Sequence, residues 1–423
     1  MNTTSTRRGF IKTAAWAAAM PTIIPASVLG KNGSVAPSNR IVLGGIGIGP
    51  RGREVLGAFL KQPDVQFVAV ADVQKMRREI VRKTADRHHG NQDCKGYADM
   101  AEVLGRDDID AVLIATGDRW HAPASILAAQ AGKDVYSEKP CAMTIQECED
   151  LDEAMLRHER VYQAGTQRRS VDNFRAAVDL ARSGKLGKLQ TLHAGILTPM
   201  NNLPPLPGEP DPDPEEINWD AWVGPAPLRP FNKRYVEGRW RNHEGLAAGF
   251  NILEWGSHTV DLCQWAAAAD GTTPVEYEAE GGTIRATYPN GVKLVMRLSG
   301  FAKEGDWLGL GTCPIRFEGD EGWVEAGDHG KIATSSPSMV SSQPAEMAGT
   351  NPLHHVRNFL DCVKSRAKPV CNSTVARYGH VACHAAAISW KLGRKLRFNP
   401  ATAAFIDDAE ADAMRSSARR APY

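Results

Sequence analysis

The stretch that decides the fold runs from residue 40 to residue 52 and reads Arg40-Ile41-Val42-Leu43-Gly44-Gly45-Ile46-Gly47-Ile48-Gly49-Pro50-Arg51-Gly52. Its first half is typical of a buried β-strand, and its second half is a G-x-G-x-x-G pattern that leads into a helix-like run at 53–60. Such glycines let the main chain turn tightly and approach a pyrophosphate at the helix N-terminus. The stretch predicts a dinucleotide-binding turn; the alternative is a packed turn without a ligand.

Asp72 favours the dinucleotide, because it ends the next apolar run, at 67–70, about twenty residues after the glycine turn. A carboxylate at this point accepts hydrogen bonds from the hydroxyls of the adenosine ribose. It would repel the 2′-phosphate of NADP, so the sequence favours NAD as the cofactor. Arg77 and Arg78 weigh toward NADP.

Strand-like apolar runs alternate with helix-like segments on the C-terminal side of this turn. The predicted strands are 40–43, 67–70, 111–115, 134–136 and 161–164, and the predicted helices are 53–60, 74–88, 122–131 and 145–158. This alternation predicts βαβ units in a parallel sheet that is buried on both faces. The fold class is therefore α/β, with an N-terminal Rossmann dinucleotide-binding domain over residues 38–168.

The pattern changes to longer β runs with polar alternation after residue 189. These runs are 190–196, 275–281, 284–288, 292–298 and 315–318, with Pro289-Asn290-Gly291 as a hairpin turn between two of them. They predict a C-terminal α+β domain over 169–400 that contains a large, open, mostly antiparallel sheet. The proline-rich segment 204–214 is predicted to be a surface loop, and residues 401–423 a peripheral helical tail.

The N-terminus has the layout of a twin-arginine export signal, in which Arg7 and Arg8 precede a short apolar run at 14–24. That run is about half of the ~20 residues that a membrane-spanning helix needs. We expect a signal and linker over 1–37, a periplasmic location, and no membrane association after signal removal. The alternative is a basic amphipathic N-terminus that arises by chance.

Composition points to a small-molecule partner. The 423 residues carry 50 basic and 49 acidic side chains, so no broad field exists to recruit nucleic acid or an anionic membrane. The eight cysteines lack the spacing of a zinc site, and we predict no metal centre. His380 and His384 are four residues apart, but no third ligand is evident, so structural roles are favoured.

Two further motifs carry groups that suit proton transfer. Glu138-Lys139-Pro140 follows the strand predicted at 134–136, where ligands meet open α/β sheets. Glu254, His258 and Asp261 share one face of a predicted helix around 249–265, so an acid there can set the histidine tautomer and raise its basicity. A solvent-facing lysine and a core histidine are the alternatives.

Taken together, these motifs resemble one family. The glycine turn, the 115–121 segment Ala-Thr-Gly-Asp-Arg-Trp-His, Glu138-Lys139-Pro140, the 165–170 segment Gly-Thr-Gln-Arg-Arg-Ser and the Trp255-Gly256-Ser257-His258 helix occur in the order of the glucose–fructose oxidoreductase / inositol dehydrogenase family. The likeness covers about 38–400. It implies that Lys139 contacts the substrate hydroxyl or relays its proton, that His258 acts as general acid/base, and that the C-terminal sheet forms homodimers or homotetramers. One departure is Glu254, where the family usually has aspartate. Either Glu254 orients His258 from a slightly shifted helix, or the substrate and chemistry differ.

The predicted site residues fall into three sets. The catalytic set is Lys139, His258 and Glu254. The cofactor-binding set is Gly47, Gly49, Pro50, Arg51, Gly52, Asp72, Thr116, Asp118, Trp120, His121, Glu138, Lys139 and Gln167. The substrate set is Lys139, Arg168, Trp240, Asp261 and His258, with Trp240 in an aromatic and basic rim that also includes Arg239 and Arg241.

The leading functional hypothesis is hydride transfer between a sugar or polyol hydroxyl carbon and a tightly bound NAD. Free NAD is expected to be scarce outside the cytoplasm, so the cofactor would have to be recycled in place. One alternative is a redox-neutral NAD-dependent glycosidase that acts through a 3-keto intermediate on a glycoside. The other is a non-catalytic sugar-sensing scaffold.

Overall fold

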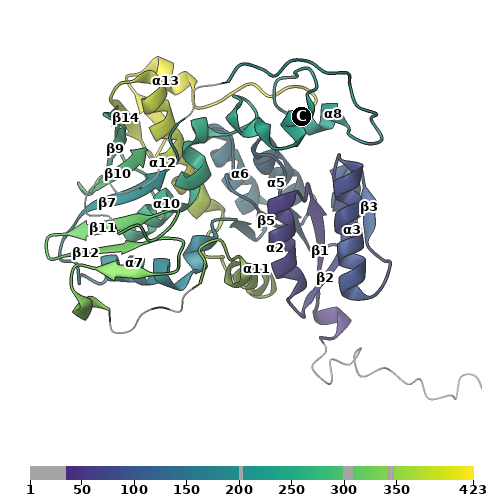
Figure 1. Ribbon diagram of the computed structural model, residues 1–423, viewed down its shortest axis with the longest axis horizontal. Helices are drawn as coiled ribbons and strands as arrows, with labels where there is room; N and C mark the ends of the chain where they lie inside the picture. The colour runs from purple at the N-terminus through teal and green to yellow at the C-terminus, as the bar shows by residue number, and fades with distance from the viewer. Residues whose placement is uncertain (1–34, 200–202, 299–307, 341–343, 345–346) are drawn as a thin grey trace, which may run out of the picture. The chain divides into compact units, whose positions relative to one another are not determined.

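The computed structural model describes residues 35–199, 203–298, 308–340, 344 and 347–423. The twin-arginine motif and its apolar run lie outside the described residues. Residues 1–40 form a unit of their own, in which the short helix η1 (Pro37–Asn39) is described. All other elements belong to the unit 41–423 (Figure 1).

The first sheet has six parallel strands in the order β3-β2-β1-β4-β5-β6. The strands are β1 (Ile41–Ile46), β2 (Val65–Ala71), β3 (Lys95–Tyr97), β4 (Ala111–Ile114), β5 (Asp134–Ser137) and β6 (Tyr162–Ala164). The connecting helices are α2 (Pro50–Leu60), α3 (Lys75–His89), α4 (Met100–Leu104), α5 (His121–Gln130) and α6 (Ile145–Arg157). The predicted Rossmann fold is confirmed. The order in which the chain adds strands reverses between β1 and β4, which is where such sheets bind ligands.

Helix α2 begins earlier than the sequence predicts. Pro50 occupies its first turn and Gly49 is the extended residue that precedes it. Proline suits this position because its fixed φ is helical and its missing N–H would have no helical partner. The glycine turn is therefore shorter, and the helix N-terminus lies closer to β1, than a helix starting at residue 53 would allow.

The second sheet has nine strands in the order β13-β12-β11-β7-β10-β9-β8-β14-β15. They are β7 (Leu189–Ile196), β8 (Glu276–Glu280), β9 (Thr283–Thr287), β10 (Lys293–Leu298), β11 (Ile315–Gly319), β12 (Trp323–Ala326), β13 (Ile332–Thr334), β14 (Leu396–Asn399) and β15 (Ala404–Ile406). Only β7 and β10, among these described strands, pair in parallel. The predicted mostly antiparallel sheet is confirmed.

Helices α7 (Asp172–Arg182), α10 (Ile252–Ala266) and α12 (Ser373–Leu392) pack against the second sheet. Helix α12 also packs against α6, so one apolar core runs from the second sheet into the first domain. Helix α11 (Leu353–Ser365) packs on α2, where the Phe359 ring lies 6.1 Å from that of Phe59. The chain thus returns to the first domain after building most of the second sheet.

Residues 401–423 differ from the predicted helical tail. They contribute β15 at the edge of the second sheet and only a short helix, α13 (Ala409–Ala413). The last residues then reach helix α8 (Trp219–Val223), beside which the chain ends (Figure 1). There Tyr423 donates a hydrogen bond to Asp220 (2.7 Å) and its ring meets that of Trp120 edge-on. Pairing with β14 and this anchoring override the local helical tendency.

A segment that we call the cover segment, residues 203–248, holds the short helices α8 (Trp219–Val223), α9 (Lys233–Val236) and η4 (Arg239–Asn242). It has an apolar cluster of its own, in which the Trp219 and Trp222 rings stack 4.7 Å apart. The proline-rich part of it is a largely exposed loop, as predicted. The remaining short helices are η2 (Asp118–Trp120), η3 (Gln167–Ser170), η5 (Gly249–Asn251) and η6 (Pro337–Met339).

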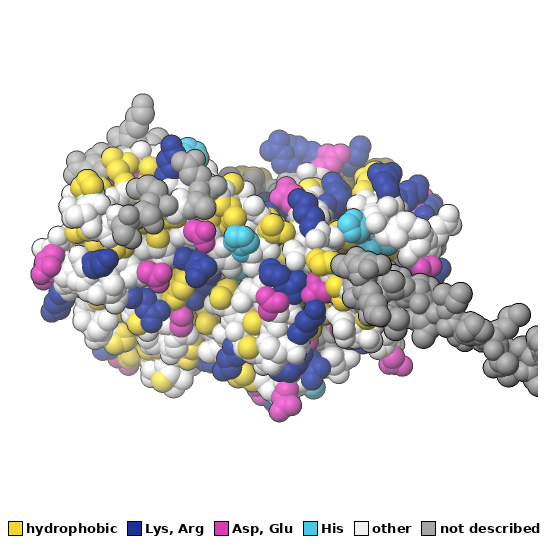
Figure 2. All heavy atoms as spheres, turned by 90° about the horizontal axis from the view of Figure 1, so that it is seen from below, with side chains coloured by type: hydrophobic (Ala, Val, Ile, Leu, Met, Phe, Trp, Pro, Cys, Tyr) yellow, Lys and Arg dark blue, Asp and Glu magenta, His cyan; other side chains and the backbone are white. Residues whose placement is uncertain are grey.

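Acidic and basic side chains are interspersed on the face drawn in Figure 2. Within the described residues, every helix is too short or too polar to cross a bilayer. No group of three histidine, cysteine or acidic side chains there has the geometry to hold a metal ion. His380 and His384 instead hydrogen-bond to the carbonyls of Ala376 and Ala142. The eight cysteines are all free and buried.

Candidate active site

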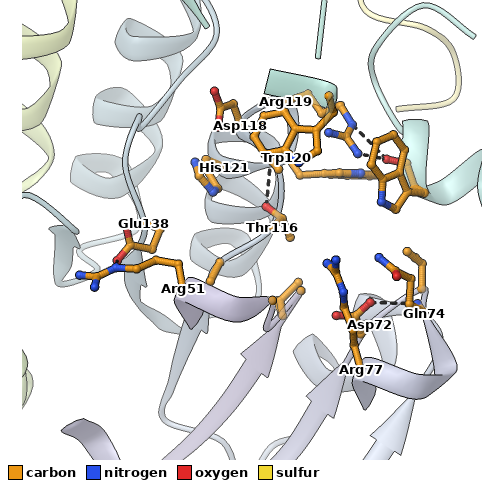
Figure 3. A pocket seen from close by; sticks show the side chains of 18 of the residues that line it. Arg51, Asp72, Gln74, Arg77, Thr116, Asp118, Arg119, Trp120, His121 and Glu138 are labelled. Atoms are coloured by element: carbon orange, nitrogen blue, oxygen red, sulfur yellow. Dashed lines mark hydrogen bonds and ion pairs between the residues drawn. The ribbon is translucent and has the colours of Figure 1, made fainter. Parts of the chain in front are cut away.

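A cavity of about 710 Å³ lies at the carboxyl ends of β1, β2, β4 and β5, under the cover segment (Figure 3). Its walls include most of the residues that the sequence predicted: Gly47, Gly49, Pro50, Arg51, Asp72, Thr116, Asp118, Trp120, His121, Glu138, Lys139, Gln167, Trp240, Glu254 and His258. Gly52, Arg168 and Asp261 are not among them. The structure thus brings residues from both predicted domains to one cavity.

The glycine turn approaches the end of β4 closely. Gly47 has a φ of +65°, and a Cβ atom there would lie 2.3 Å from Thr116. Only glycine fits this position. The first turn of α2 has no side-chain cap, so its N–H groups are available to an anion in the cavity.

Gly52 has a packing role and does not contact the cavity, which corrects its predicted assignment. A Cβ atom at this position would lie 2.8 Å from Cβ of Ala115. The missing side chain lets α2 pack closely on the sheet, which is the use of the third glycine in such turns.

Asp72 meets the requirement for a ribose-binding carboxylate. Its Oδ1 accepts a hydrogen bond from the Gln74 N–H at 2.9 Å (Figure 3). Its Oδ2 is buried and has no hydrogen-bond partner in the described part of the chain. Burial raises the pKa of Asp72 to about 6. An orphaned acceptor in the cavity wall is costly unless a ligand hydroxyl donates to it, so the residues present fit a dinucleotide.

Substituting Asp72 tests this assignment. We expect Asp72→Ala to weaken NAD binding by about tenfold to a hundredfold, because a hydrogen bond to a charged group contributes about 1.5–3 kcal/mol. NADP should lose less, since the repulsive carboxylate is gone and Arg77 remains beside it. Titration calorimetry with both nucleotides measures the change. Asp107→Ala, which removes an exposed carboxylate of the same domain, should alter neither affinity; equal losses for NAD and NADP would contradict the assignment.

Arg77 lies over the glycine turn, because its Nη1 is 3.3 Å from the position that a Gly49 Cβ would occupy. Its Nη2 donates to the Val236 carbonyl of the cover segment at 2.9 Å. The guanidinium therefore links α3, the glycine turn and the cover segment around the position where a pyrophosphate would lie.

Glu138 organises the neighbouring wall. Its Oε1 accepts a hydrogen bond from Arg51 Nε at 3.2 Å (Figure 3). A Cβ atom on Gly165 would come within 2.9 Å of the Glu138 carboxyl carbon, so the chain after β6 approaches this side chain closely. The Gln167 amide completes the cluster when its oxygen faces Arg51, 3.0 Å from Nη2. These groups fix the end of β5, from which Lys139 projects.

Lys139 is held by Glu254. Its Nζ lies 3.1 Å from Oε1 of Glu254 and donates to the Glu254 carbonyl at 3.0 Å. Burial would raise the pKa of Glu254, but the charges of Lys139 and Arg241 lower it below the ordinary value. Of the two alternatives for Glu254, the one in which it orients His258 is therefore wrong, because the carboxylate pairs with the ammonium group of Lys139 instead.

His258 is buried, and its Nδ1 has no hydrogen-bond partner among the described residues. Burial lowers its pKa well below the ordinary value, and the positive charges of Arg168 and Lys139 act in the same direction. The imidazole is therefore neutral at physiological pH and able to accept a proton.

Arg168 and Asp261, which the sequence assigned to substrate, are committed to buried ion pairs. Arg168 donates to both carboxylate oxygens of Asp328 at 2.8 and 2.7 Å. Asp261 accepts from Arg169 at 2.6 and 2.9 Å. The reason is tertiary: η3 brings Arg169 against α10, and a buried carboxylate pairs with the cation beside it.

Tyr423 and Asn218 also line the cavity, and no pattern in the sequence pointed to either. Tyr423 reaches it only because the chain's last residues cross to α8. Asn218 caps α8 and donates its backbone N–H to the Val73 carbonyl. Both positions depend on long-range packing.

The parallel sheet, glycine turn and orphaned carboxylate define a dinucleotide-binding protein of the Rossmann class with a second α+β domain. Residues 40–166 match the oxidoreductase family with an NAD-binding Rossmann fold, and residues 206–423 match the C-terminal alpha/beta domain of the same family. The chain belongs to this family of glucose–fructose oxidoreductase and inositol dehydrogenase type, as its motifs indicated.

Curated relatives match only parts of the chain. A glycosyl hydrolase family 109 protein of Stenotrophomonas maltophilia is 28% identical over 270 residues, which are 61% of this chain and 54% of the relative. Glycosyl hydrolase family 109 protein 1 of Shewanella sp. is 32% identical over 140 residues, 30% of this chain and 29% of the relative. The chain thus spans about half or less of these relatives.

Solved structures share the fold. The aldose-aldose oxidoreductase of Caulobacter crescentus, complexed with glycerol, has a TM-score of 0.60 at 17% identity. The match covers 85% of this chain and 100% of that one. The present protein therefore has the same fold across both domains.

Proposed function

We propose that the protein transfers hydride between a hydroxyl carbon of a sugar or polyol and a tightly held NAD. One observation supports this most: a single cavity contains the glycine turn and Asp72 as well as Lys139 and His258. In the order β2-β1-β4-β5, Asp72 and Lys139 are three strand spacings apart, or roughly 14 Å. That separation suits a dinucleotide that lies across the strand ends.

The chain's own residues supply proton transfer and positioning. When bound, NAD supplies the nicotinamide ring that accepts hydride. His258, being neutral, takes the hydroxyl proton on its ring nitrogen. Lys139 donates a hydrogen bond to the same substrate oxygen and stabilises the negative charge that develops there. Glu254 holds the Lys139 ammonium in place from the first turn of α10.

The cover segment supports tight retention of the cofactor. The carbonyl of Glu216, in the cover segment, accepts a hydrogen bond from the backbone N–H of Lys75 at the start of α3 (3.0 Å). The cover segment also accepts from Trp120 Nε1 at the Ala221 carbonyl (3.0 Å), on the β4 side of the cavity. Release of a dinucleotide would require these contacts to open.

We also propose export to the periplasm, supported by the twin-arginine motif, and assembly into a homodimer or homotetramer through the C-terminal sheet. Along β8 and β9 of that sheet exposed residues alternate with buried ones, so one face is available for self-association. A retained cofactor in that compartment would be reoxidised in place by a second carbonyl substrate.

A second candidate function is a redox-neutral glycosidase, which the names of the glycosyl hydrolase relatives favour. Oxidation at C3 would acidify the C2–H, and loss of that proton would expel the aglycone from C1 by elimination. Water would then add across the resulting C1–C2 double bond, and the hydride would return to C3. The same His258 and Lys139 would serve the oxidation and the return.

The test is mass spectrometry of nucleotide released from the denatured protein, combined with assays of sugars, polyols and chromogenic glycosides. We expect stoichiometric NAD and a change in nicotinamide absorbance with at least one sugar or polyol. Aglycone release without net NADH would identify the redox-neutral cycle. Bound NAD with neither activity would favour a sugar-sensing scaffold, and protein that neither retains nor binds added NAD would contradict all of these proposals.

A further inference from the structure

A second cavity, of about 590 Å³, adjoins the first, because Arg119 and Arg241 belong to the walls of both. Its other walls come from the 143–147 segment that follows the Glu138-Lys139-Pro140 motif, the turn at 249–251 before α10, parts of the cover segment at 225–227 and 243–247, one side of α12, and residues 413–419. It therefore lies next to the groups that we assign to proton transfer. The proposed function assigns no role to this cavity.

The charges of this second cavity do not balance. Its two acidic side chains are already paired, Glu147 with Arg419 at 3.1 Å and Glu244 with Lys391 at 3.2 Å. Arg119 and Arg241 are the two remaining cations of the described wall, and neither has a carboxylate partner. A cavity with two guanidinium groups that form no ion pair attracts an anion.

Arg119, which belongs to the walls of both cavities, has an unsatisfied hydrogen-bond donor. The side chain is 3% exposed, and its Nε donates to the carbonyls of Trp222 and Val223 at 3.0 and 3.1 Å. Its Nη1 is buried and has no partner in the described part of the chain. Neighbouring Asp118 uses its Oδ2 to accept from the Ala248 N–H at 3.1 Å. A buried charged donor of this kind calls for an acceptor from outside the protein.

Arg241 is exposed, with its guanidinium 4.5 Å from the centre of the Trp240 ring. It makes no hydrogen bond or ion pair with any described residue. It lines the first cavity together with Glu254 and Lys139, and its charge lowers the pKa of Glu254. It can therefore contact a substrate group that extends from that point into the second cavity.

The turn at 249–251, in the wall of the second cavity, has a strained backbone. Gly249, Phe250 and Asn251 have successive φ values of +58°, +51° and +73°, of which the last two are unusual for residues with side chains. Backbone of this kind is found where a ligand site requires it. Here it carries Phe250 into the second cavity, with the ring 4.8 Å from Lys391 Nζ.

We propose that the second cavity is a substrate subsite that binds a carboxylate on the substituent or neighbouring residue of the sugar. Arg119 provides its unpartnered Nη1, and Arg241 provides a planar fork that suits a carboxylate. The reacting hydroxyl then lies at Lys139 and His258. The inference rests on the proposed function and names its substrate class: acidic glycosides or acidic oligosaccharides.

The test uses matched probes and the purified holoenzyme. The probes are 4-carboxyphenyl and 4-carbamoylphenyl glycosides of glucose, galactose and N-acetylgalactosamine, which differ in charge but little in shape. Titration calorimetry should show at least one acid binding about tenfold or more tightly than its amide. Arg241→Gln should reduce this preference to within about twofold. Arg234→Gln removes an exposed arginine of the cover segment that lines neither cavity, and it should leave the preference intact.

Three results would overturn the inference: no acid preferred over its amide in any pair, including no measurable binding; a preference that survives Arg241→Gln; or a soaked crystal with the aglycone outside the second cavity. Turnover of neutral sugars without a preference for the acid would contradict the carboxylate subsite but would still support the proposed function. A preference for the acid without hydride transfer or aglycone release would support the carboxylate subsite but contradict the proposed function.

Discussion

Lys139→Met is expected to lower kcat by roughly 10²–10⁴-fold while NAD stays bound, because it removes the group that donates to the substrate oxygen and keeps the length of the side chain. The ammonium is held between the side chain and the carbonyl of Glu254, so it has a defined position before substrate arrives. Steady-state kinetics on the best sugar substrate, with mass spectrometry of the retained nucleotide, measures both effects.

Two further variants distinguish a catalytic effect of the Lys139 substitution from a general effect of losing a charge or of disturbing the fold. Lys185→Met removes an exposed lysine of the second domain and should leave kcat unchanged. Glu254→Gln keeps the size of the carboxylate but weakens its hold on the ammonium. It should lower kcat by less than Lys139→Met does, with an unchanged content of bound NAD. Turnover by Lys139→Met at the rate of the unmodified protein would refute the role of this lysine.

The short-range signals in the sequence were enough for the first domain. An apolar run, a glycine turn and a carboxylate about twenty residues on are all local in the chain, and strand order follows from right-handed crossovers between them. Gly47 is an example. Its φ of +65° and its close approach to Thr116 permit no side chain, so this local requirement can be recognised in the sequence from the glycine itself. The observed start of α2 differs from the predicted one by a few residues, because the helix begins at Pro50.

The partners of the charged residues were not predictable in this way. Glu254, His258 and Asp261 share a helical face, and spacing alone suggests that they act together. In the structure Glu254 pairs with Lys139, 115 residues earlier in the chain, and Asp261 with Arg169. Which cation a buried carboxylate meets is decided by helix packing, and helix packing depends on contacts distant in sequence. Tyr423 reached the cavity for the same reason.

His258→Gln is expected to lower kcat/KM by roughly 10²–10⁴-fold, because glutamine can hydrogen-bond to the substrate but cannot take its proton. His88→Gln, on the exposed side of α3, is the matched control and should have no effect. Both proteins should retain NAD, since His258 lies at the substrate end of the cavity. Loss of NAD together with activity would indicate a structural role for His258.

The pH dependence of kcat/KM tests whether the imidazole of His258 is the base. The base works when unprotonated, so activity falls as pH drops through its pKa. If the base were a histidine of ordinary pKa, kcat/KM would fall to half of its maximum near pH 6.5. Burial, Arg168 and Lys139 lower the pKa of His258, so the fall should come at a pH clearly below that. Lys139→Met removes one of these charges and should therefore move the acid limb of its residual activity upward in pH. An acid limb that stays in place would show that the titrating group is not the imidazole facing Lys139, and the assignment of the base would fail.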